Sequence, residues 1–278
     1  MTNQARVLID CNDEKGLVYK VSKVFYDHAL NIESNQEFVD KSAGKFFMRS
    51  VVEGKFNPEQ LQKELAFILP QEAKISVKIP GKKNLILMVT KESHALGDLL
   101  IRHKAGELNA NILAVIGNHT DLKDLVERFD IPFFLVSAEG LSREDHEKKI
   151  SQIIDTFSFD YIVLAKYMRI LTSSFVRRYA YKLINIHHSF LPAFVGANPY
   201  KQAYERGVKI IGATAHFVTD QLDEGPIIAQ DVIPVDHRFS WKEMQKAGRD
   251  VEKIVLSRAV SLLLDDRVFV YHNKTIIL

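Results

Sequence analysis

The chain has 278 residues, which is enough for two cores, because domains typically contain about 100 to 200 residues. A composition of 46% hydrophobic and 26% charged residues excludes the disordered and fibrous classes. The formal net charge is +2, and basic residues are scattered among acidic ones, so nothing indicates a nucleic-acid partner.

The cysteine content and the N-terminus predict the compartment. The single cysteine, Cys11, cannot form an internal disulfide and has no second thiol with which to bind a metal. The N-terminal residues lack the basic-then-apolar pattern of a secretory signal, and no apolar run approaches the roughly 20 residues that span a bilayer. We therefore expect a cytoplasmic protein that does not enter a membrane.

The first part of the chain predicts a small α/β domain. Apolar alternation and helical spacing give, in order, a strand at 6–11, a helix at 17–30, strands at 31–39 and 46–53, a helix at 58–68 and a strand at 73–79. The polar turn at 40–44 joins the two middle strands as a hairpin. This βαββαβ order is the split arrangement of ferredoxin-like folds.

The second part predicts a larger α/β domain. Residues 80–83 break the apolar pattern, so we place the domains at 1–82 and 83–278. Strands are expected at 85–89, 112–116, 161–165, 183–186, 213–218 and 227–232, and helices at 95–103, 121–129, 145–157 and 241–264. Short buried strands that alternate with helices indicate a doubly wound, mostly parallel sheet.

Polar residues gather where the strand at 183–186 ends. Asn185, His187 and Ser189 occur there, and ligands of open α/β sheets bind at the carboxyl ends of strands. Asp223 follows in a turn-like segment further along the chain. An amide can donate to a developing oxyanion, an imidazole can carry a proton, and a carboxylate can orient water or a partner side chain. The set therefore suits acyl transfer or acyl hydrolysis.

Each of these side chains also has an ordinary structural interpretation. Taken singly, His187 and His188 would more often be structural or surface histidines, and Asp223 would be a turn former. Asn185 would cap a strand end. His216 would either pack in the core or support a site, and His188 would either be a partner of His187 or form a wall of a water pocket.

Several motifs occur in order between residues 161 and 230: Val163-Leu164-Ala165, Met168-Arg169-Ile170-Leu171, Asn185-Ile186-His187, Ser189-Phe190-Leu191-Pro192, His216-Phe217-Val218-Thr219-Asp220 and Leu222-Asp223-Glu224-Gly225-Pro226. Together they resemble the folate-dependent formyltransferase family. The segment at 11–17 resembles the loop after the first strand of an ACT domain. The two resemblances cover nearly the whole chain and imply an ACT regulatory domain followed by a formyltransferase-like catalytic domain.

An ACT domain ahead of this catalytic domain is the arrangement of the deformylase branch of the family. Its members hydrolyse 10-formyltetrahydrofolate to tetrahydrofolate and formate, in the one-carbon metabolism that serves purine biosynthesis. Two departures from the transferases support this branch. The loop at 90–96 lacks the glycines that would let backbone N–H groups bind a phosphate, and Glu92 would repel one. His188 stands where the transferases have a proline.

The resemblance implies roles for the site residues. Asn185 would donate to the oxyanion, His187 would polarise the formyl oxygen or pass a proton, and Asp223 would orient His187 and water. Which group acts as the base stays open. The implied substrate-binding residues are Met168, Arg169, Ile170, Leu171, His188, Val195, Gly196, His216 and Val218. No metal and no cofactor beyond the folate substrate are implied, and the histidines lack a spacing such as H-E-x-x-H.

The ACT resemblance implies an effector site and an oligomer. Asn12, Asp13, Lys15 and Gly16 would lie where paired domains bind an amino acid such as glycine or methionine. Such pairing implies a homo-oligomer, either a dimer or a tetramer. Two alternatives stay open: a transferase that passes the formyl group to an amine such as glycinamide ribonucleotide, and a ligand sensor. The complete Asn, His and Asp set argues against a sensor.

Overall fold

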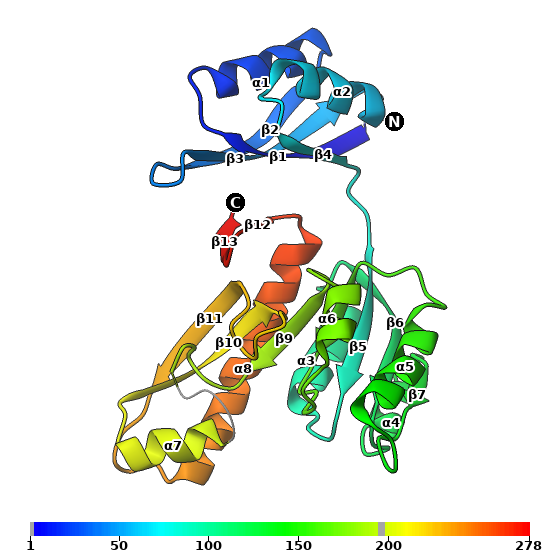
Figure 1. Ribbon diagram of the computed structural model, residues 1–278, viewed down its shortest axis with the longest axis vertical. Helices are drawn as coiled ribbons and strands as arrows, with labels where there is room; N and C mark the ends of the chain where they lie inside the picture. Colours follow the sequence, from blue (N-terminus) through cyan, green and yellow to red (C-terminus); the bar gives the residue numbers. More distant parts are fainter. Residues whose placement is uncertain (1–2, 194–197) are drawn as a thin grey trace. The chain divides into compact units, whose positions relative to one another are not determined.

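A computed structural model describes residues 3–193 and 198–278 (Figure 1). Backbone contacts divide the chain into two compact units. The first contains the described residues up to Gly81, together with Asp265–Tyr271 and Ile276–Leu278. The second contains Lys82–Leu264 and His272–Thr275, apart from the undescribed gap. Within the described ranges, no helix has both the length and the apolar character that crossing a bilayer requires.

The first unit has the predicted βαββαβ order: β1 (Asn3–Asn12), α1 (Leu17–Asp27), β2 (Asn31–Asp40), β3 (Lys45–Gly54), α2 (Pro58–Ile68) and β4 (Lys74–Lys78). Its sheet has the order β2-β3-β1-β4, and every neighbouring pair is antiparallel. The ferredoxin-like prediction for this part of the chain is therefore confirmed, with element boundaries within a few residues of those expected.

One face of this sheet is covered by α1 and α2 (Figure 1). Because alternate residues of a strand point to the same face, Val7 and Ile9 of β1 meet the apolar stripes of both helices. The stripes contain Leu17, Val21, Val24 and Phe25 in α1, and Leu61 and Leu65 in α2. Asn57 is the N-cap of α2, and its side chain accepts a hydrogen bond from the N–H of Gln60.

The other face of the sheet is covered by the C-terminal strands β12 (Val268–Tyr271) and β13 (Lys274–Ile277). Leu8 and Phe47 pack there against Phe269 and Leu278. Asp266 forms ion pairs with Arg6 at 3.1 Å and with Lys78 at 2.8 Å. These contacts group most of the C-terminal segment with the first unit, whereas the division expected from sequence placed all of 83–278 in the second domain.

The second unit contains the remaining elements: β5 (Lys83–Val89), α3 (His94–Lys104), β6 (Ala110–Gly117), α4 (Lys123–Glu127), β7 (Phe133–Leu135), α5 (Arg143–Ile154), β8 (Tyr161–Leu164), α6 (Ser173–Arg178), β9 (Leu183–His187), α7 (Pro199–Arg206), β10 (Ile210–Phe217), β11 (Ile227–Pro234) and α8 (Trp241–Leu264). The sheet order is β11-β10-β9-β8-β5-β6-β7. Strands β9, β8, β5, β6 and β7 are parallel, and β10 and β11 are antiparallel additions.

Helices cover both faces of this sheet, as the doubly wound prediction requires. Helices α5 and α6 pack on the face that carries Ile86 and Met88 of β5. The long helix α8 runs behind β9, β10 and β11 in Figure 1 and also contacts α3 and α7. The carboxyl ends of β5, β8 and β9 lie at one edge, where the loops that follow them meet.

Candidate active site

A cavity of about 430 Å³ opens at the carboxyl ends of β8 and β9. Its wall is built from the loop after β8, the end of β9, the end of β10 and the loop before β11. Titratable and charged side chains concentrate in it: Glu92, Lys166, Arg169, His187, His188, His216, Asp220 and Asp223. The position agrees with the general rule that open α/β sheets bind ligands at this edge.

Asn185, His187 and Asp223 come together in the wall of this cavity. Asn185 and His187 are two residues apart on β9, so their side chains share one face of the strand. Nδ1 of His187 lies 3.3 Å from Oδ2 of Asp223. Nε2 of His187 is buried and has no hydrogen-bond partner among the described residues. One ring nitrogen is thus held by the carboxylate, while the other is available to a ligand.

His216 supports this group from the neighbouring strand. It is paired in register with Asn185 across the β9–β10 ladder. Nδ1–H of His216 donates to the carbonyl of Phe217 at 2.8 Å, so in the neutral ring Nε2 can accept from the amide of Asn185 at 3.3 Å. The same Nε2 lies 3.7 Å from Oδ1 of Asp223. His216 is therefore both a buried residue and a neighbour of two site residues.

The carboxyl group of Asp223 is held in its ionised form. Burial opposes ionisation, but the hydrogen bond from His187 and the nearby imidazole of His216 outweigh it and keep the pKa of this carboxyl well below its usual range. The backbone at Asp223 has a φ of 58°, in the left-handed region that non-glycine residues seldom adopt. The loop therefore holds Asp223 in an uncommon backbone conformation, and in this conformation the carboxylate lies near both imidazoles.

His188 lies next to His187 in the wall. Its ring centroid lies 5.3 Å from that of His187 and 5.9 Å from that of Tyr200. Burial lowers the pKa of His188 to about 4, and the positive charge of Lys166 acts in the same direction. The two adjacent histidines therefore have neighbours of opposite charge: His187 lies beside the negative Asp223, and His188 lies near the positive Lys166.

A buried charged cluster that the sequence did not predict lies behind His188. Glu252 of α8 accepts a hydrogen bond from Tyr200 at 2.7 Å, lies 2.8 Å from Nε2 of His94, and pairs with Lys166 at 3.2 Å. Burial opposes the ionisation of Glu252, but His94, Lys166 and Tyr200 lower its pKa to about 2. Two features of the sequence could have indicated this cluster. Lys166 directly follows the buried strand expected at 161–165, and Glu252 lies among the apolar residues of the closing helix.

The loop with Met168, Arg169, Ile170 and Leu171 forms the outer wall of the cavity. Met168 and Ile170 are 56% and 53% exposed, which leaves apolar surface at the mouth. The N–H of Met168 donates to Thr90 Oγ1 at 2.9 Å, and the N–H of Thr172 donates to the buried Glu147 at 2.9 Å. The loop is therefore anchored near both of its ends.

The remaining predicted site residues are distributed as follows. Val218 lines the same cavity. Val195 and Gly196 lie outside the described residues. Asn12, at the end of β1, and Asp13, Lys15 and Gly16, in the loop before α1, are exposed residues of the first unit and are not part of the cavity lining. Among residues 3–193 and 198–278, no group of three or more His, Cys, Asp or Glu side chains could hold a metal ion.

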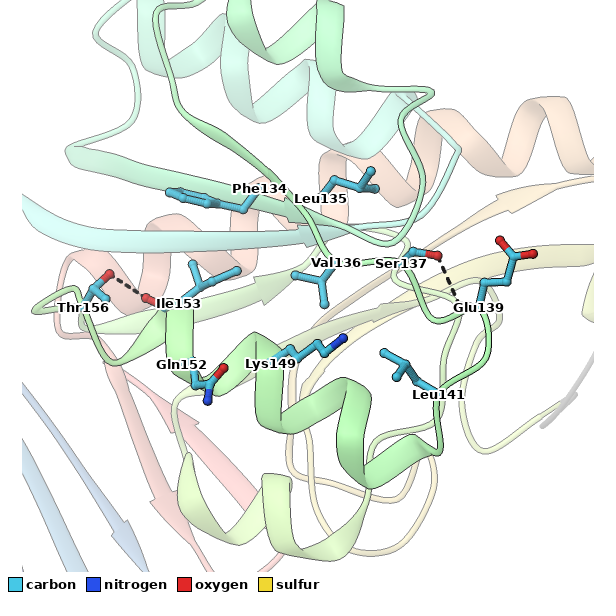
Figure 2. Close-up of a pocket in the computed structure, with 10 residues that line it drawn as sticks. All are labelled: Phe134, Leu135, Val136, Ser137, Glu139, Leu141, Lys149, Gln152, Ile153 and Thr156. Atoms are coloured by element: carbon cyan, nitrogen blue, oxygen red, sulfur yellow. Dashed lines mark hydrogen bonds between the residues drawn. The ribbon is translucent and has the colours of Figure 1, made fainter.

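A second cavity, of about 540 Å³, lies beside β7 and α5 (Figure 2). Figure 2 shows its lining side chains, which include Phe134, Val136 and Ile153 and the two charged residues Glu139 and Lys149. No imidazole lines it. It therefore has no side chain that readily exchanges a proton near neutral pH beside its carboxylate, and the cavity at β8 and β9 is the stronger candidate for the active site.

Comparison with known proteins identifies the family. A model described as formyl transferase matches residues 83–260, and an ACT domain model matches residues 5–69. The formyltetrahydrofolate deformylase of Escherichia coli (strain K12) is 58% identical over 268 residues, which covers 96% of each chain. That of Bacillus subtilis (strain 168) is 44% identical and covers 99% of this chain and 94% of the relative.

This chain belongs to the formyltetrahydrofolate deformylase family. A crystal structure of a formyltetrahydrofolate deformylase from Pseudomonas syringae pv. tomato matches it with a TM-score of 0.95 and 42% identity, over 100% of this chain and 95% of that one. A glycinamide ribonucleotide transformylase from Symbiobacterium toebii matches 71% of this chain and 94% of its own, with a TM-score of 0.68 and 26% identity. The likeness to formyltetrahydrofolate deformylases thus extends over both units.

Proposed function

We propose that this protein hydrolyses 10-formyltetrahydrofolate to tetrahydrofolate and formate, with Asn185, His187 and Asp223 as its catalytic residues. The observation that supports the site most directly is the convergence of these three side chains on one cavity, with a buried and unpartnered Nε2 on His187. Membership of the deformylase family supplies the substrate class and the reaction.

The geometry is compatible with each chemical step. Water attacks the formyl carbon, negative charge collects on the formyl oxygen, and N10 must leave with a proton. Asn185 lies beside His187 on β9 and would donate to the oxyanion, an interaction whose removal typically costs a hundredfold or more in rate. His187, held through Nδ1 by Asp223, would carry the proton to N10 through Nε2. Asp223 would also stabilise the positive charge that His187 acquires.

The rim of the cavity suits a flat heteroaromatic ring. We propose that the pterin binds between the loop with Met168, Arg169, Ile170 and Leu171 and the segment that begins at Val218. Exposed aliphatic groups would cover the faces of the ring, and main-chain N–H and C=O groups would bind its edges. His188 and His216 line the same cavity and would contact the substrate beside His187 and Asn185. Val195 and Gly196, at the approach, are proposed from the family resemblance alone.

Hydrolysis is favoured over transfer to a phosphorylated amine. Glu92 lines the cavity, where its carboxylate repels a phosphate, and it pairs with Arg249 at 3.2 Å. The loop from Thr90 to Ser93 has no glycine that would let backbone N–H groups approach a phosphate. Both features disfavour a phosphorylated acceptor at this loop.

A direct assay tests the proposed function. The protein is incubated with 10-formyltetrahydrofolate and no amine, and formate release is measured. Steady release is expected, and Asp223→Asn is expected to reduce kcat by on the order of a hundredfold or more, because His187 loses its charged partner. Exposed Asp124→Asn is the control. Turnover that requires an added amine would reject hydrolysis, and full activity of Asp223→Asn would reject the site.

We propose that the domain over residues 1–82 is regulatory and that 83–278 is catalytic. The exposed loop with Asn12, Asp13, Lys15 and Gly16 would bind an amino acid, glycine or methionine, between paired ACT domains of a homo-oligomer. The buried lone Cys11 favours a reducing compartment, and we propose a cytoplasmic location. Binding of each amino acid by calorimetry, together with the molar mass in solution, tests the effector and oligomer proposals.

A further inference from the structure

The imidazole of His188 has no role in the steps derived so far, although it faces the cavity next to His187. No hydrogen bond joins it to another residue that the structure describes. The neighbouring Tyr200 donates its hydroxyl to Glu252, and Lys166 forms an ion pair with the same carboxylate. A half-buried imidazole with its ring nitrogens uncommitted is suited to bind a small polar molecule. Water is the co-substrate of the reaction, so it is the first candidate.

The carboxylates of the cavity wall already have partners, since Glu92 pairs with Arg249 and Asp220 pairs with Arg177. The carboxylate of Asp223 is engaged by His187 through one oxygen and lies near His216 through the other. Nε2 of His187 is required to deliver a proton to the leaving nitrogen. His188 is the remaining imidazole of the wall whose lone pair is uncommitted among the described residues. Because it lies beside His187, a base and an acid would stand on adjacent positions of the cavity wall.

We propose that His188 takes the proton from the attacking water and that Lys166, Glu252 and Tyr200 position it as one buried unit. The inference rests on the proposed hydrolysis and deepens it. Water attacks the formyl carbon as its proton passes to His188. The bond from carbon to N10 then breaks as protonated His187 gives its proton to N10. Formic acid leaves and ionises, and the proton on His188 returns to His187 for the next turnover, so that one proton is released overall.

The charged groups that face His188 decide its protonation state. Lys166, from the loop after β8, and His187, from β9, disfavour the protonated ring. Glu252 from α8 and Asp223 from the loop before β11 favour it. Burial and Lys166 prevail, so His188 is neutral near pH 7 and its lone pair is available. Opposite environments for two neighbouring titratable groups are the usual basis of an acid and base assignment.

The cluster also fixes the ring in place. Tyr200, which packs beside His188, is held by Glu252 at 2.7 Å, and Gly248 of α8 leaves the space that the Tyr200 hydroxyl occupies, since a Cβ at this position would lie 2.0 Å from it. Lys166 adopts a left-handed backbone conformation with a φ of 63°, and its side chain is 3% exposed. Lys166 therefore combines an uncommon backbone geometry with a buried charge near His188.

The first test removes the imidazole. In His188→Ala, kcat for formate release is expected to fall by on the order of a hundredfold, with KM for the folate changed less than threefold, and added imidazole is expected to restore part of the rate. His119→Asn, at an exposed histidine, is the control. Activity of His188→Ala within threefold of wild type would overturn the inference, and so would a loss that imidazole does not rescue.

The second test uses the sign of the charge effects. The low-pH limb of the pH–kcat/KM profile is expected to move to higher pH in Lys166→Met, to lower pH in Glu252→Gln, and to return toward wild type in the double variant. Lys201→Met, on the surface of α7, is the control. A purely structural role lowers activity without opposite displacements, so shifts of the same sign, or none, would overturn the positioning role. Each single variant is decisive by itself, because each is expected to move the limb in a stated direction, and the double variant shows whether a folding defect comes from a buried unpaired charge.

Failure of this inference is distinguishable from failure of the proposed function. If the wild-type protein releases no formate from 10-formyltetrahydrofolate, hydrolysis itself is rejected. If the wild type hydrolyses its substrate and His188→Ala does so equally well, hydrolysis stands and the assignment of His188 is wrong.

Discussion

At the scale of single residues, the second unit concentrates ionised groups in positions that water hardly reaches. Glu252 is 1% exposed and Asp223 has a side chain that is 9% exposed, yet both remain charged because histidine, lysine and tyrosine side chains surround them. Buried carboxylates of this kind stabilise a fold only while their partners stay in place. Their titration therefore couples the pH of the medium to the stability of the unit.

The contribution of Glu252 to stability is expected to depend on pH in a defined direction. Its pKa is about 2 in the folded chain against 4.5 ordinarily, so its stabilising effect is full above pH 4.5 and is lost as the pH falls toward 2. Because one pKa unit corresponds to about 1.4 kcal/mol, the effect amounts to about 3 kcal/mol. The unfolding free energies of wild type and Glu252→Gln can be measured by urea titration at several pH values. The difference between them should narrow by about this amount as the pH falls from above 4.5 to about 2. A difference that does not vary with pH would contradict this.

Gly225 controls the placement of Asp223. A Cβ at Gly225 would lie 1.8 Å from the carbonyl oxygen of Phe217, and backbone cannot yield as a flexible side chain can. In Gly225→Ala the loop must shift, and kcat is expected to fall about tenfold or more, since misplacement of a catalytic group by about 1 Å has effects of this size. Gly97→Ala, where no atom lies within 4 Å of the added carbon, is the matched control and should retain full activity. Equal rates for both variants would contradict the prediction.

At the scale of elements, segments with a clear apolar pattern were predictable, and several short segments without one were not. The four strands and two helices of the first unit, and β5, β6, β8, β9, β10, β11 and α8, were expected from apolar patterns near their observed bounds. Strand β7, with 3 residues, and helices α6 and α7, with 6 and 8, are too short to show a period. Helix α4 spans Lys123–Glu127 and is shorter than the helix expected at 121–129.

The candidate site was predictable to the same extent. Asn185 and His187 lie on one strand, and Asp223 lies in the motif at 222–226. The sequence therefore indicated this group of residues. The cluster of Glu252 with His94 and Lys166 joins residues that are far apart in the chain and come from separate elements, and no local pattern records such a pairing. Tertiary packing alone brings them together.

The anchored loop after β8 leads to an element-scale prediction about substrate affinity. Glu147 of α5 is buried and accepts hydrogen bonds from both the N–H and the hydroxyl of Thr172, the residue that follows Leu171. In Glu147→Ala the loop loses one of its two anchors, so KM for the folate is expected to rise about tenfold while kcat changes little. Steady-state kinetics measure both constants. Exposed Glu144→Ala on the same helix is the control, and an unchanged KM in Glu147→Ala would refute the role of the anchor.

At the scale of the whole molecule, the first unit is built from both ends of the chain. The face of its sheet that carries Leu8 and Phe47 is covered by Phe269 and Leu278, and Arg49 donates to the carbonyls of Asp265 and Asp266 at 2.9 and 3.2 Å. The composition-based boundary near residue 82 could not reveal this, because two short C-terminal strands carry no signal that identifies their partner. Their apolar residues are explained only by the sheet that they cover.

Removal of one ring from this contact is expected to weaken the first unit. Phe269 is 9% exposed and meets Phe47 edge to face, with ring centroids 5.8 Å apart. Phe269→Ala should lower the unfolding free energy of the unit by about 3 kcal/mol and accelerate hydrogen exchange in β1 and β3. Phe67→Ala, at a side chain that is 90% exposed, is the matched control. Identical exchange rates in the two variants would show that the C-terminal cover adds no stability.

The return of the C-terminus to the first unit has a consequence for biosynthesis. A ribosome makes a chain from its N-terminal side onward, and N-terminal domains generally fold while the rest is still being translated. Here the nascent β1–β3 face keeps Leu8 and Phe47 open to solvent until Phe269 and Leu278 have left the exit tunnel. The first unit is thus completed only after Phe269 and Leu278 have been made, and a product terminated before them would expose this apolar surface to chaperones and proteases.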